Sequence, residues 1–209
     1  MSTHKTQSDK KKLVDFSRIE KFHPYKTFLF FALLGSTVVF MAVTFLFILS
    51  LSRTVPLENF NLPKPFFLST LLLLFSSYSV SKTLKAFNKD LPRNLLLYLG
   101  MTLLSGLVFA SLQLVSWKML FDSGFMLASH TRISYLYLIS GIHFLHVLLG
   151  LVFLSTIFVT VFRRSGDAVK SLLYFSDQFQ KTKIELAVIF WHFVDFLWLG
   201  LFLIFLFAF

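Results

Sequence analysis

The chain has 209 residues, of which 56% are hydrophobic, 14% are charged and none is Cys. An ordinary soluble domain is about a quarter charged, and a disordered chain is poor in hydrophobic residues, so both classes are excluded. The lack of Cys also excludes a disulfide scaffold, an iron–sulfur cluster and a zinc site with Cys ligands. The composition therefore indicates an integral membrane protein.

Five long apolar stretches follow one another along the sequence, and we expect each to form a transmembrane helix. Four of them run without a charge for 26, 17, 24 and 30 residues, and the last contains two acids. About 20 apolar residues cross a bilayer as a helix, and lysines at both ends can extend the short second run. The prediction is an all-α membrane domain, 27–209, with helices at about 27–52, 65–84, 94–118, 133–162 and 184–208. A basic tail, 1–26, precedes it, and the loop 163–183 has room for a short interfacial helix.

The distribution of Lys and Arg predicts how the chain lies in the membrane. Sixteen of these residues fall in the tail and in the second and fourth loops, and four fall in the first and third loops. The positive-inside rule therefore places the N-terminus in the cytoplasm and the C-terminus in the periplasm. The net charge of +10 lies beside helix ends, where it faces anionic headgroups, so we expect no nucleic-acid partner.

Ionisable residues inside the membrane are costly, and here they gather in the last two predicted helices. His143 and His146 are three residues apart, as are His192 and Asp195, and Glu185 precedes His192 by seven residues. Residues at these spacings share one face of a helix. Because the two helices run antiparallel, His146 and Asp195 are expected at similar depth, where they can pair.

Four interpretations of these residues remain open from their spacing. They are a metal site, a haem with paired His ligands, a proton path through Glu185, His192 and Asp195, and a network that packs the helices together. His-x-x-His alone is a weak sign of a metal. We favour the packing network, which predicts no catalytic residue, metal or cofactor in this chain.

Five further residues belong to the same prediction. Gln113 is expected to hydrogen-bond between helices, and Gly141 and Gly150 are expected to allow close approach of backbones. Trp191 and Trp198 are expected either to pack as generic aromatics or to line a surface for lipid or a partner. The four serines between positions 76 and 81 are expected to bond their own helix backbone.

Two motifs resemble signatures of subunit III of the haem–copper terminal oxidases. The family's penultimate helix carries Gly-x-His-x-x-His-Val-x-x-Gly, which is similar to Gly141, His143, His146, Val147 and Gly150. Its last helix carries a Glu and then Trp-His-Phe-Val-Asp-x-x-Trp, which is similar to Glu185, Trp191, His192, Phe193, Val194, Asp195 and Trp198. The five-helix layout resembles the bacterial form of the family.

The resemblance implies a subunit without redox centres, in a bacterial inner membrane. Haems and copper belong to subunits I and II of such an oxidase, and subunit III packs on subunit I and holds phospholipid in a cleft. By analogy, the polar residues named above would shape the helix bundle and its lipid cleft. Two positions where many relatives carry an acid hold Thr37 and Ser116 here.

The expected function is therefore a non-catalytic, stabilising subunit of a bacterial aa3-type, proton-pumping cytochrome c oxidase in aerobic electron transport. A corresponding subunit of a quinol oxidase or of a nitric oxide reductase is the near alternative. A small transporter or proton path built on Glu185, His192 and Asp195 is the alternative from another class.

Overall fold

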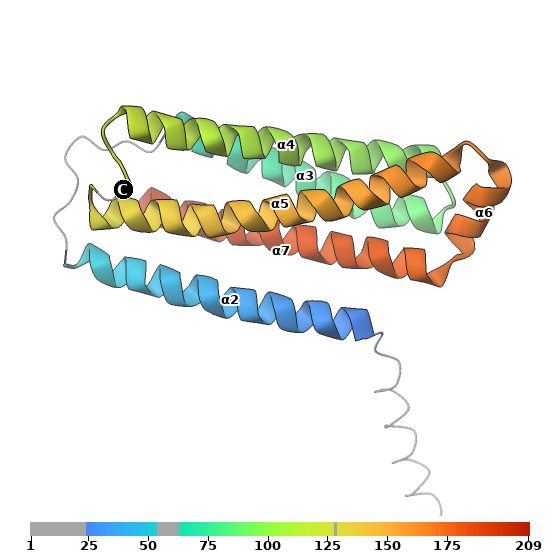
Figure 1. Cartoon of the computed structure of the whole chain (residues 1–209), viewed down its shortest axis with the longest axis horizontal. Helices are drawn as coiled ribbons and strands as arrows, with labels where there is room; N and C mark the ends of the chain where they lie inside the picture. The colour runs from blue at the N-terminus through green and yellow to red at the C-terminus, as the bar shows by residue number, and fades with distance from the viewer. Residues whose placement is uncertain (1–23, 54–62, 128) are drawn as a thin grey trace, which may run out of the picture. The chain divides into compact units, whose positions relative to one another are not determined.

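The computed structural model describes residues 24–53, 63–127 and 129–209. These residues form α2 (Pro24–Leu51), α3 (Lys64–Asn88), α4 (Pro92–Asp122), α5 (Thr131–Ser165), α6 (Ala168–Ser176) and α7 (Gln178–Ala208) (Figure 1). All of them except α6 are long and apolar enough to cross a bilayer, which confirms the prediction of five transmembrane helices. Each predicted helix has its counterpart in the same order along the chain.

Each of the five observed spans is longer than its predicted counterpart, because the helical backbone continues past the apolar stretch. α3 runs on to Asn88 through Lys82 and Lys85, whose long side chains can reach the membrane surface. α7 begins at Gln178, six residues before the predicted start, because the Asp177 side chain caps it by accepting a hydrogen bond from the Phe179 amide at 2.8 Å.

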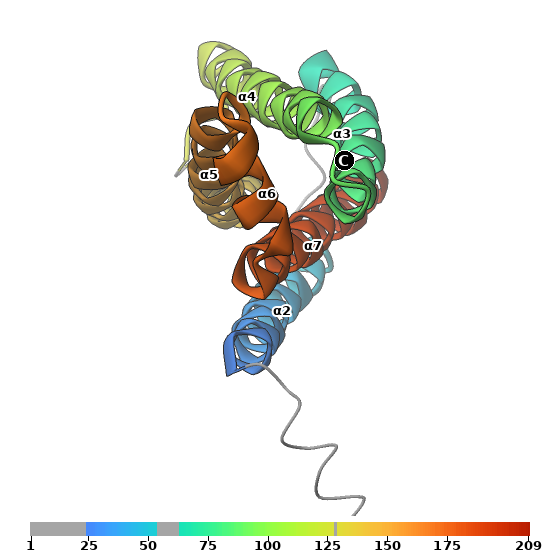
Figure 2. The same ribbon diagram turned by 90° about the vertical axis from the view of Figure 1, so that its right-hand side faces the viewer.

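Four helices form a ring in which each contacts two neighbours. α3 packs against α4, α4 against α5, α5 against α7, and α7 against α3. Seen along the helices, these four surround a common core, and α6 crosses from the end of α5 to the start of α7 (Figure 2). Phe109 of α4, Leu136 of α5 and Trp198 of α7 are fully buried in this core. Antiparallel neighbours and short connections are typical of a membrane helix bundle.

The chain divides into two compact units, Met1–Val38 and Val39–Phe209, and α2 spans the division. In the first unit, the described part of α2 exposes large apolar side chains such as Phe28 and Phe31. In the second unit, the remainder of α2 carries Phe47, which is fully buried and packs edge-on against Phe205 of α7 with ring centroids 5.9 Å apart. Aromatic contacts thus tie this part of α2 to the bundle.

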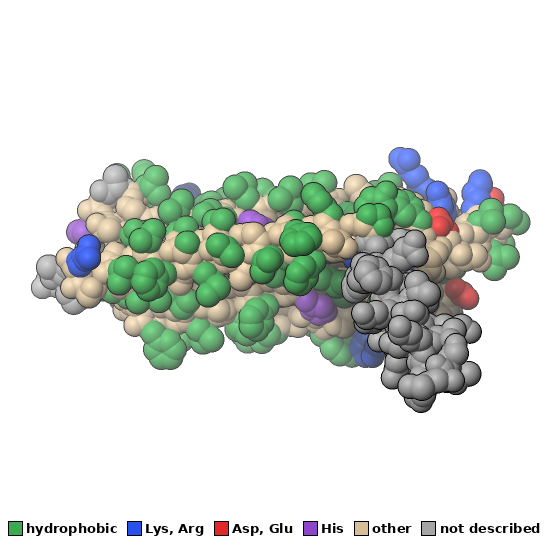
Figure 3. Space-filling model, turned by 90° about the horizontal axis from the view of Figure 1, so that it is seen from below, with side chains coloured by type: hydrophobic (Ala, Val, Ile, Leu, Met, Phe, Trp, Pro, Cys, Tyr) green, Lys and Arg blue, Asp and Glu red, His purple; other side chains and the backbone are tan. Residues whose placement is uncertain are grey.

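Apolar side chains cover most of the outer surface of the helices, as expected for a surface in contact with lipid. Figure 3 shows them spread along one face, with the Lys and Arg side chains nearer its ends. Exposed examples on three helices of the ring are Leu71, Leu104 and Val152, each more than 60% exposed. A helix that is apolar on its outer as well as its inner side is typical of a membrane span.

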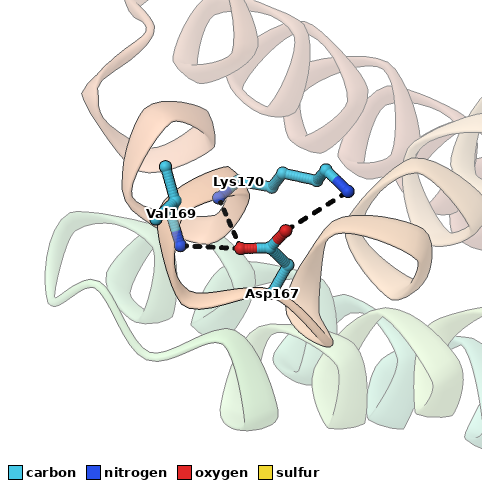
Figure 4. Close-up of polar contacts among 3 residues, drawn as sticks. All are labelled: Asp167, Val169 and Lys170. Carbon is cyan, nitrogen blue, oxygen red and sulfur yellow. Dashed lines mark hydrogen bonds and ion pairs between the residues drawn. The ribbon is translucent and has the colours of Figure 1, made fainter.

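α6 is the short helix that the sequence placed in the loop between the last two spans. The Asp167 side chain caps it by accepting hydrogen bonds from the amides of Val169 at 3.0 Å and Lys170 at 3.4 Å, and it pairs with the Lys170 ammonium at 3.2 Å (Figure 4). On its inner side, Tyr174 is buried against Phe87 of α3, and this burial raises the pKa of Tyr174 to about 12. Val169 and its neighbouring leucines remain exposed, which suits a helix at a membrane surface.

Candidate functional site

The contact between α3 and α7 carries a row of polar side chains, which we call the α3–α7 seam. Its members are Thr70, Ser76, Ser77, Ser81, Trp191, His192 and Trp198. The indole of Trp191 donates to the Ser76 hydroxyl at 2.8 Å, and the indole of Trp198 donates to the Thr70 hydroxyl at 3.1 Å. The two indoles are seven residues apart, so the same contact recurs after two helical turns.

The third polar contact of the seam is made by His192. Its Nδ1 lies 2.8 Å from the Ser77 hydroxyl, and its Nε2 lies 3.1 Å from the Ser81 hydroxyl. Ser81 also donates to the Ser77 carbonyl of its own helix at 2.9 Å. Both ring nitrogens of His192 are therefore directed to α3, and the Asp195 carboxyl is not their hydrogen-bond partner.

Trp191 is held in place by two glycines as well as by Ser76. A Cβ added at Gly106 of α4 would lie 2.7 Å from the indole, and one added at Gly150 of α5 would lie 3.0 Å from it. Both positions therefore need the small residue that lets a large ring approach the backbone. Nothing lies within 4 Å of a Cβ added at Gly141, so the close approach that we expected there is absent.

The expected pair between His146 and Asp195 does not form. The Nδ1 of His146 bonds to the Ile142 carbonyl of its own helix at 2.8 Å, and its ring packs edge-on against Phe40 at 5.4 Å. The carboxyl oxygens of Asp195 are buried and have no hydrogen-bond partner among the described residues. The prediction was wrong because Asp195 faces the α3 side of α7, where it lines a recess with Ser77.

His143 and Gln113 lie on the other side of the ring, on α5 and α4. The His143 ring is fully buried beside Trp198, with centroids 4.9 Å apart, and edge-on to Phe109 at 5.7 Å. Neither His143 nor Gln113 has a hydrogen-bond partner for its side chain among the residues that the structure describes. The hydrogen bond between helices expected for Gln113 is therefore not made within this part of the chain.

The remaining predicted residue, Glu185, lies partly buried in α7, two turns before His192. Within the described ranges, no three His, Asp or Glu side chains come together as ligands of one ion would. The eight predicted polar and aromatic residues thus separate into different settings. Trp191, His192 and Trp198 join the seam, Asp195 faces the recess, and the others have surroundings of their own.

Sequence reasoning missed the hydroxyls of α3 as partners. Thr70 and Ser77 are seven residues apart, as are Ser69 and Ser76, which places each pair on one helix face. Of the four serines expected to bond their own helix, only Ser81 does so, and it also contacts His192. The hydroxyls of Ser76 and Ser77 bond to α7 instead, and that of Ser79 donates to the Tyr98 carbonyl of α4 at 3.0 Å. Thr70 and Ser76, which accept from the two indoles, are six residues apart, so the signal that could have found the seam was the recurrence of hydroxyls along α3 and not one exact spacing.

Fold and site together define a polytopic helical membrane protein in which a few polar side chains, among them Trp191, His192 and Trp198, join neighbouring helices. Comparison with known proteins identifies it further, because residues 25–208 match the family Cytochrome c oxidase subunit III. The chain belongs to the cytochrome c oxidase subunit III family, and so to the subunits III of the haem–copper oxidases.

Three relatives illustrate the range of the family. A "Probable cytochrome c oxidase subunit 3" of Rickettsia bellii is 31% identical over 147 residues, which are 69% of this chain and 47% of that protein. A "Cytochrome bo(3) ubiquinol oxidase subunit 3" of Buchnera aphidicola is 30% identical over 136 residues, 65% of this chain and 64% of the relative. A "Probable quinol oxidase subunit 3" of Staphylococcus aureus is 26% identical over 145 residues, which are 69% of this chain and 67% of that protein. The chain spans about half the length of the relatives named for cytochrome c.

Proposed function

We propose that this chain is the non-catalytic subunit III of a bacterial aa3-type, proton-pumping cytochrome c oxidase in the inner membrane. The observation that carries the proposal is the family match from residue 25 to residue 208, which covers nearly all of the five spans. Similarity to a bacterial protein named for cytochrome c oxidase supports the choice of donor. The N-terminus then lies in the cytoplasm, with the basic loops.

The chain's role is to stabilise its partner subunits, subunits I and II, which would hold the haems and copper. The use of both His192 nitrogens in contacts between helices supports this role, because a redox ligand needs its coordinating atom free. Phospholipid would cover the apolar surfaces that no partner covers. Membrane helix interfaces are stabilised mainly by packing and hydrogen bonds of this kind.

Two positions bear on proton uptake. The Thr37 hydroxyl donates to the Leu33 carbonyl at 2.8 Å, and the Ser116 hydroxyl donates to the Leu112 carbonyl at 2.8 Å. Each hydroxyl is therefore bonded within its own helix, where many relatives place an acid. We propose that neither position takes up protons in this chain, since a hydroxyl does not release its proton at ordinary pH.

A quinol-oxidising enzyme is the second candidate for the complex. The relatives named for ubiquinol or quinol oxidases match this chain over 64% and 67% of their own length, against 47% for the Rickettsia protein. The match thus leaves a smaller part of the quinol-oxidase relatives outside it. The electron donor of the complex distinguishes the two candidates, and that donor would be oxidised by other subunits.

The test is purification of the tagged chain in mild detergent, followed by a reduced-minus-oxidised optical spectrum and assays with both donors. The proposal expects larger subunits on the gel, haem a bands, and oxidation of reduced cytochrome c. Oxidation of quinol alone, with other haem bands, would identify the second candidate. A colourless preparation without partners, even after crosslinking in the membrane, would contradict both and favour the transporter.

A further inference from the structure

A recess of about 300 Å³ lies between α3 and α7, beside the seam. Thr70 and Ser77 line it from α3, and His192, Asp195 and Trp198 line it from α7. Asp195 is 9% exposed, and neither of its carboxyl oxygens has a hydrogen-bond partner among the described residues. An isolated polar group of this kind inside a membrane protein is costly, so it calls for a partner.

The other polar groups of the recess have partners of their own. Thr70 donates its proton to the Phe66 carbonyl at 2.9 Å, and Trp198 donates its indole proton to Thr70. Ser77 lies 2.8 Å from Nδ1 of His192, and Nε2 of the same ring lies 3.1 Å from Ser81. No Lys or Arg lines the recess. Neither oxygen of the Asp195 carboxyl makes a hydrogen bond to the described residues.

The depth of Asp195 limits what can supply that donor. It lies twelve residues after Lys183, the last basic residue before it, which is about 18 Å along a helix that rises 1.5 Å per residue. The carboxyl is therefore near the middle of a hydrocarbon core of about 30 Å. Lipid headgroups do not reach this depth, and acyl chains carry no donor. A donor at this level belongs to another membrane-embedded protein segment.

The mouth of the recess opens on the outer surface of the ring. Leu74 of α3 and Phe196 of α7 line it and are 55% and 76% exposed. Ile189, Phe196 and Leu203 are all exposed and recur at intervals of seven on α7. Such a stripe is the pattern that a second helix packs against. The recess therefore interrupts an apolar helix face at the level of the buried Asp195 carboxyl.

We propose that this recess is the docking site for a hydrogen-bond-donating side chain on a transmembrane helix of another oxidase subunit. The helix lies along α3 and α7, and its donor enters between Leu74 and Phe196 to reach Asp195. The proposal rests on the proposed function, since it needs a partner subunit. It adds which face of this chain meets the partner and which residue joins them.

The first test uses the natural absence of Cys from the chain. Single variants Leu74→Cys and Phe196→Cys would carry a benzophenone maleimide at the mouth of the recess, in membranes that contain the full complex. Leu104→Cys and Val152→Cys are matched controls, because both native residues are more than 60% exposed but lie on α4 and α5. We expect irradiation to join the two mouth positions to a transmembrane segment of a larger oxidase subunit, at yields at least tenfold above the controls.

The outcomes separate the docking site from the proposed function. If only α4 or α5 is joined to a larger subunit, or if the mouth positions are joined only to lipid or to another part of this chain while haem subunits co-purify, the function stands and the docking site is wrong. If no position yields an oxidase subunit and no haem co-purifies, the proposed function itself fails.

The second test separates docking from folding. Asp195→Leu removes the unpaired carboxyl, and Gln113→Leu removes another buried, unpaired side chain that lies outside the recess. We expect Asp195→Leu to lower retention of the subunit in the complex at least tenfold during a detergent titration, while the isolated subunit stays as stable as the wild type. Asp195→Asn keeps an acceptor oxygen, so a larger fraction of this variant than of Asp195→Leu should stay in the complex.

Gln113→Leu should change retention by less than twofold. Retention of Asp195→Leu within twofold of the wild type would overturn the proposal. Unfolding of the isolated Asp195→Leu subunit would overturn it too, because the carboxyl would then have its partner within this chain.

Discussion

Histidines in two regions of the helix ring, His192 at the α3–α7 seam and His143 at the α4–α5 side, are held in opposite ways. At the seam, each indole and imidazole group meets a hydroxyl of the neighbouring helix. At the α4–α5 side, the Trp117 indole likewise donates to the Ser140 hydroxyl at 3.1 Å, but His143 and Gln113, which are more deeply buried than His192, have no partner for their polar atoms within the described part of the chain. The residue that faces a His in a membrane helix therefore decides whether the imidazole is hydrogen-bonded. The spacing to the next His does not.

The difference follows from the sizes of the facing side chains. At the seam, Ser and Thr on α3 leave room for a large aromatic from α7 and also accept its proton. His143 instead faces two rings, Phe109 and Trp198, which fill the space and offer no conventional acceptor. The edges and faces of these rings attract weakly, which is enough to orient the imidazole. Trp198 belongs to both sides, since its edge bonds Thr70 and its ring covers His143.

The largest loss of stability is expected when Trp191 is displaced from its place in the seam. Gly106→Ala would put a Cβ within 2.7 Å of the indole, so the ring must move and weaken its bond to Ser76. Overpacking of this kind costs about 1–3 kcal/mol. Denaturation of the purified subunit in mixed micelles would measure the loss.

Gly141→Ala is the control for Gly106→Ala, because nothing lies within 4 Å of the added Cβ. Ala favours a helix over Gly by up to about 1 kcal/mol, so this variant should match or exceed the wild type in stability. Equal losses from the two substitutions would show that the effect comes from the helix backbone and that Trp191 does not depend on Gly106.

A smaller effect should appear when the two kinds of His are compared directly. His192→Leu removes the ring from Ser77 and Ser81 and should cost about 1 kcal/mol in the unfolding free energy. His143→Leu removes a buried group without a partner among the described residues, so its loss should cost under about 0.5 kcal/mol or add stability. The same micelle titration would measure both. A larger loss for His143→Leu would mean that its imidazole is bonded after all.

Composition was enough to predict the five spans, because apolar length alone decides which segments cross a bilayer. Spacing was not enough for the site. It placed His146 and Asp195 at similar depth but did not show that they point to different neighbours. Whether two such residues pair depends on how each helix is rotated about its axis. That rotation is set by the packing of all the large side chains. Gly106 shows this, since only the fold reveals that Trp191 lies over it.

The smallest effect is expected outside the bilayer, where water competes for the same kind of polar contact. Hydrogen bonds from Lys170 and Val169 lower the pKa of Asp167 below its ordinary value of 3.8. A lowered pKa stabilises α6 above pH 3.8, and this support is lost as the pH falls through the lower, folded value. The amide resonances of Val169 and Lys170 should therefore shift with acidification, as α6 frays, while those of the seam stay fixed. Asp167→Asn, which still caps a helix, should remove the pH dependence. Amide shifts that persist in Asp167→Asn would assign the titration to another group.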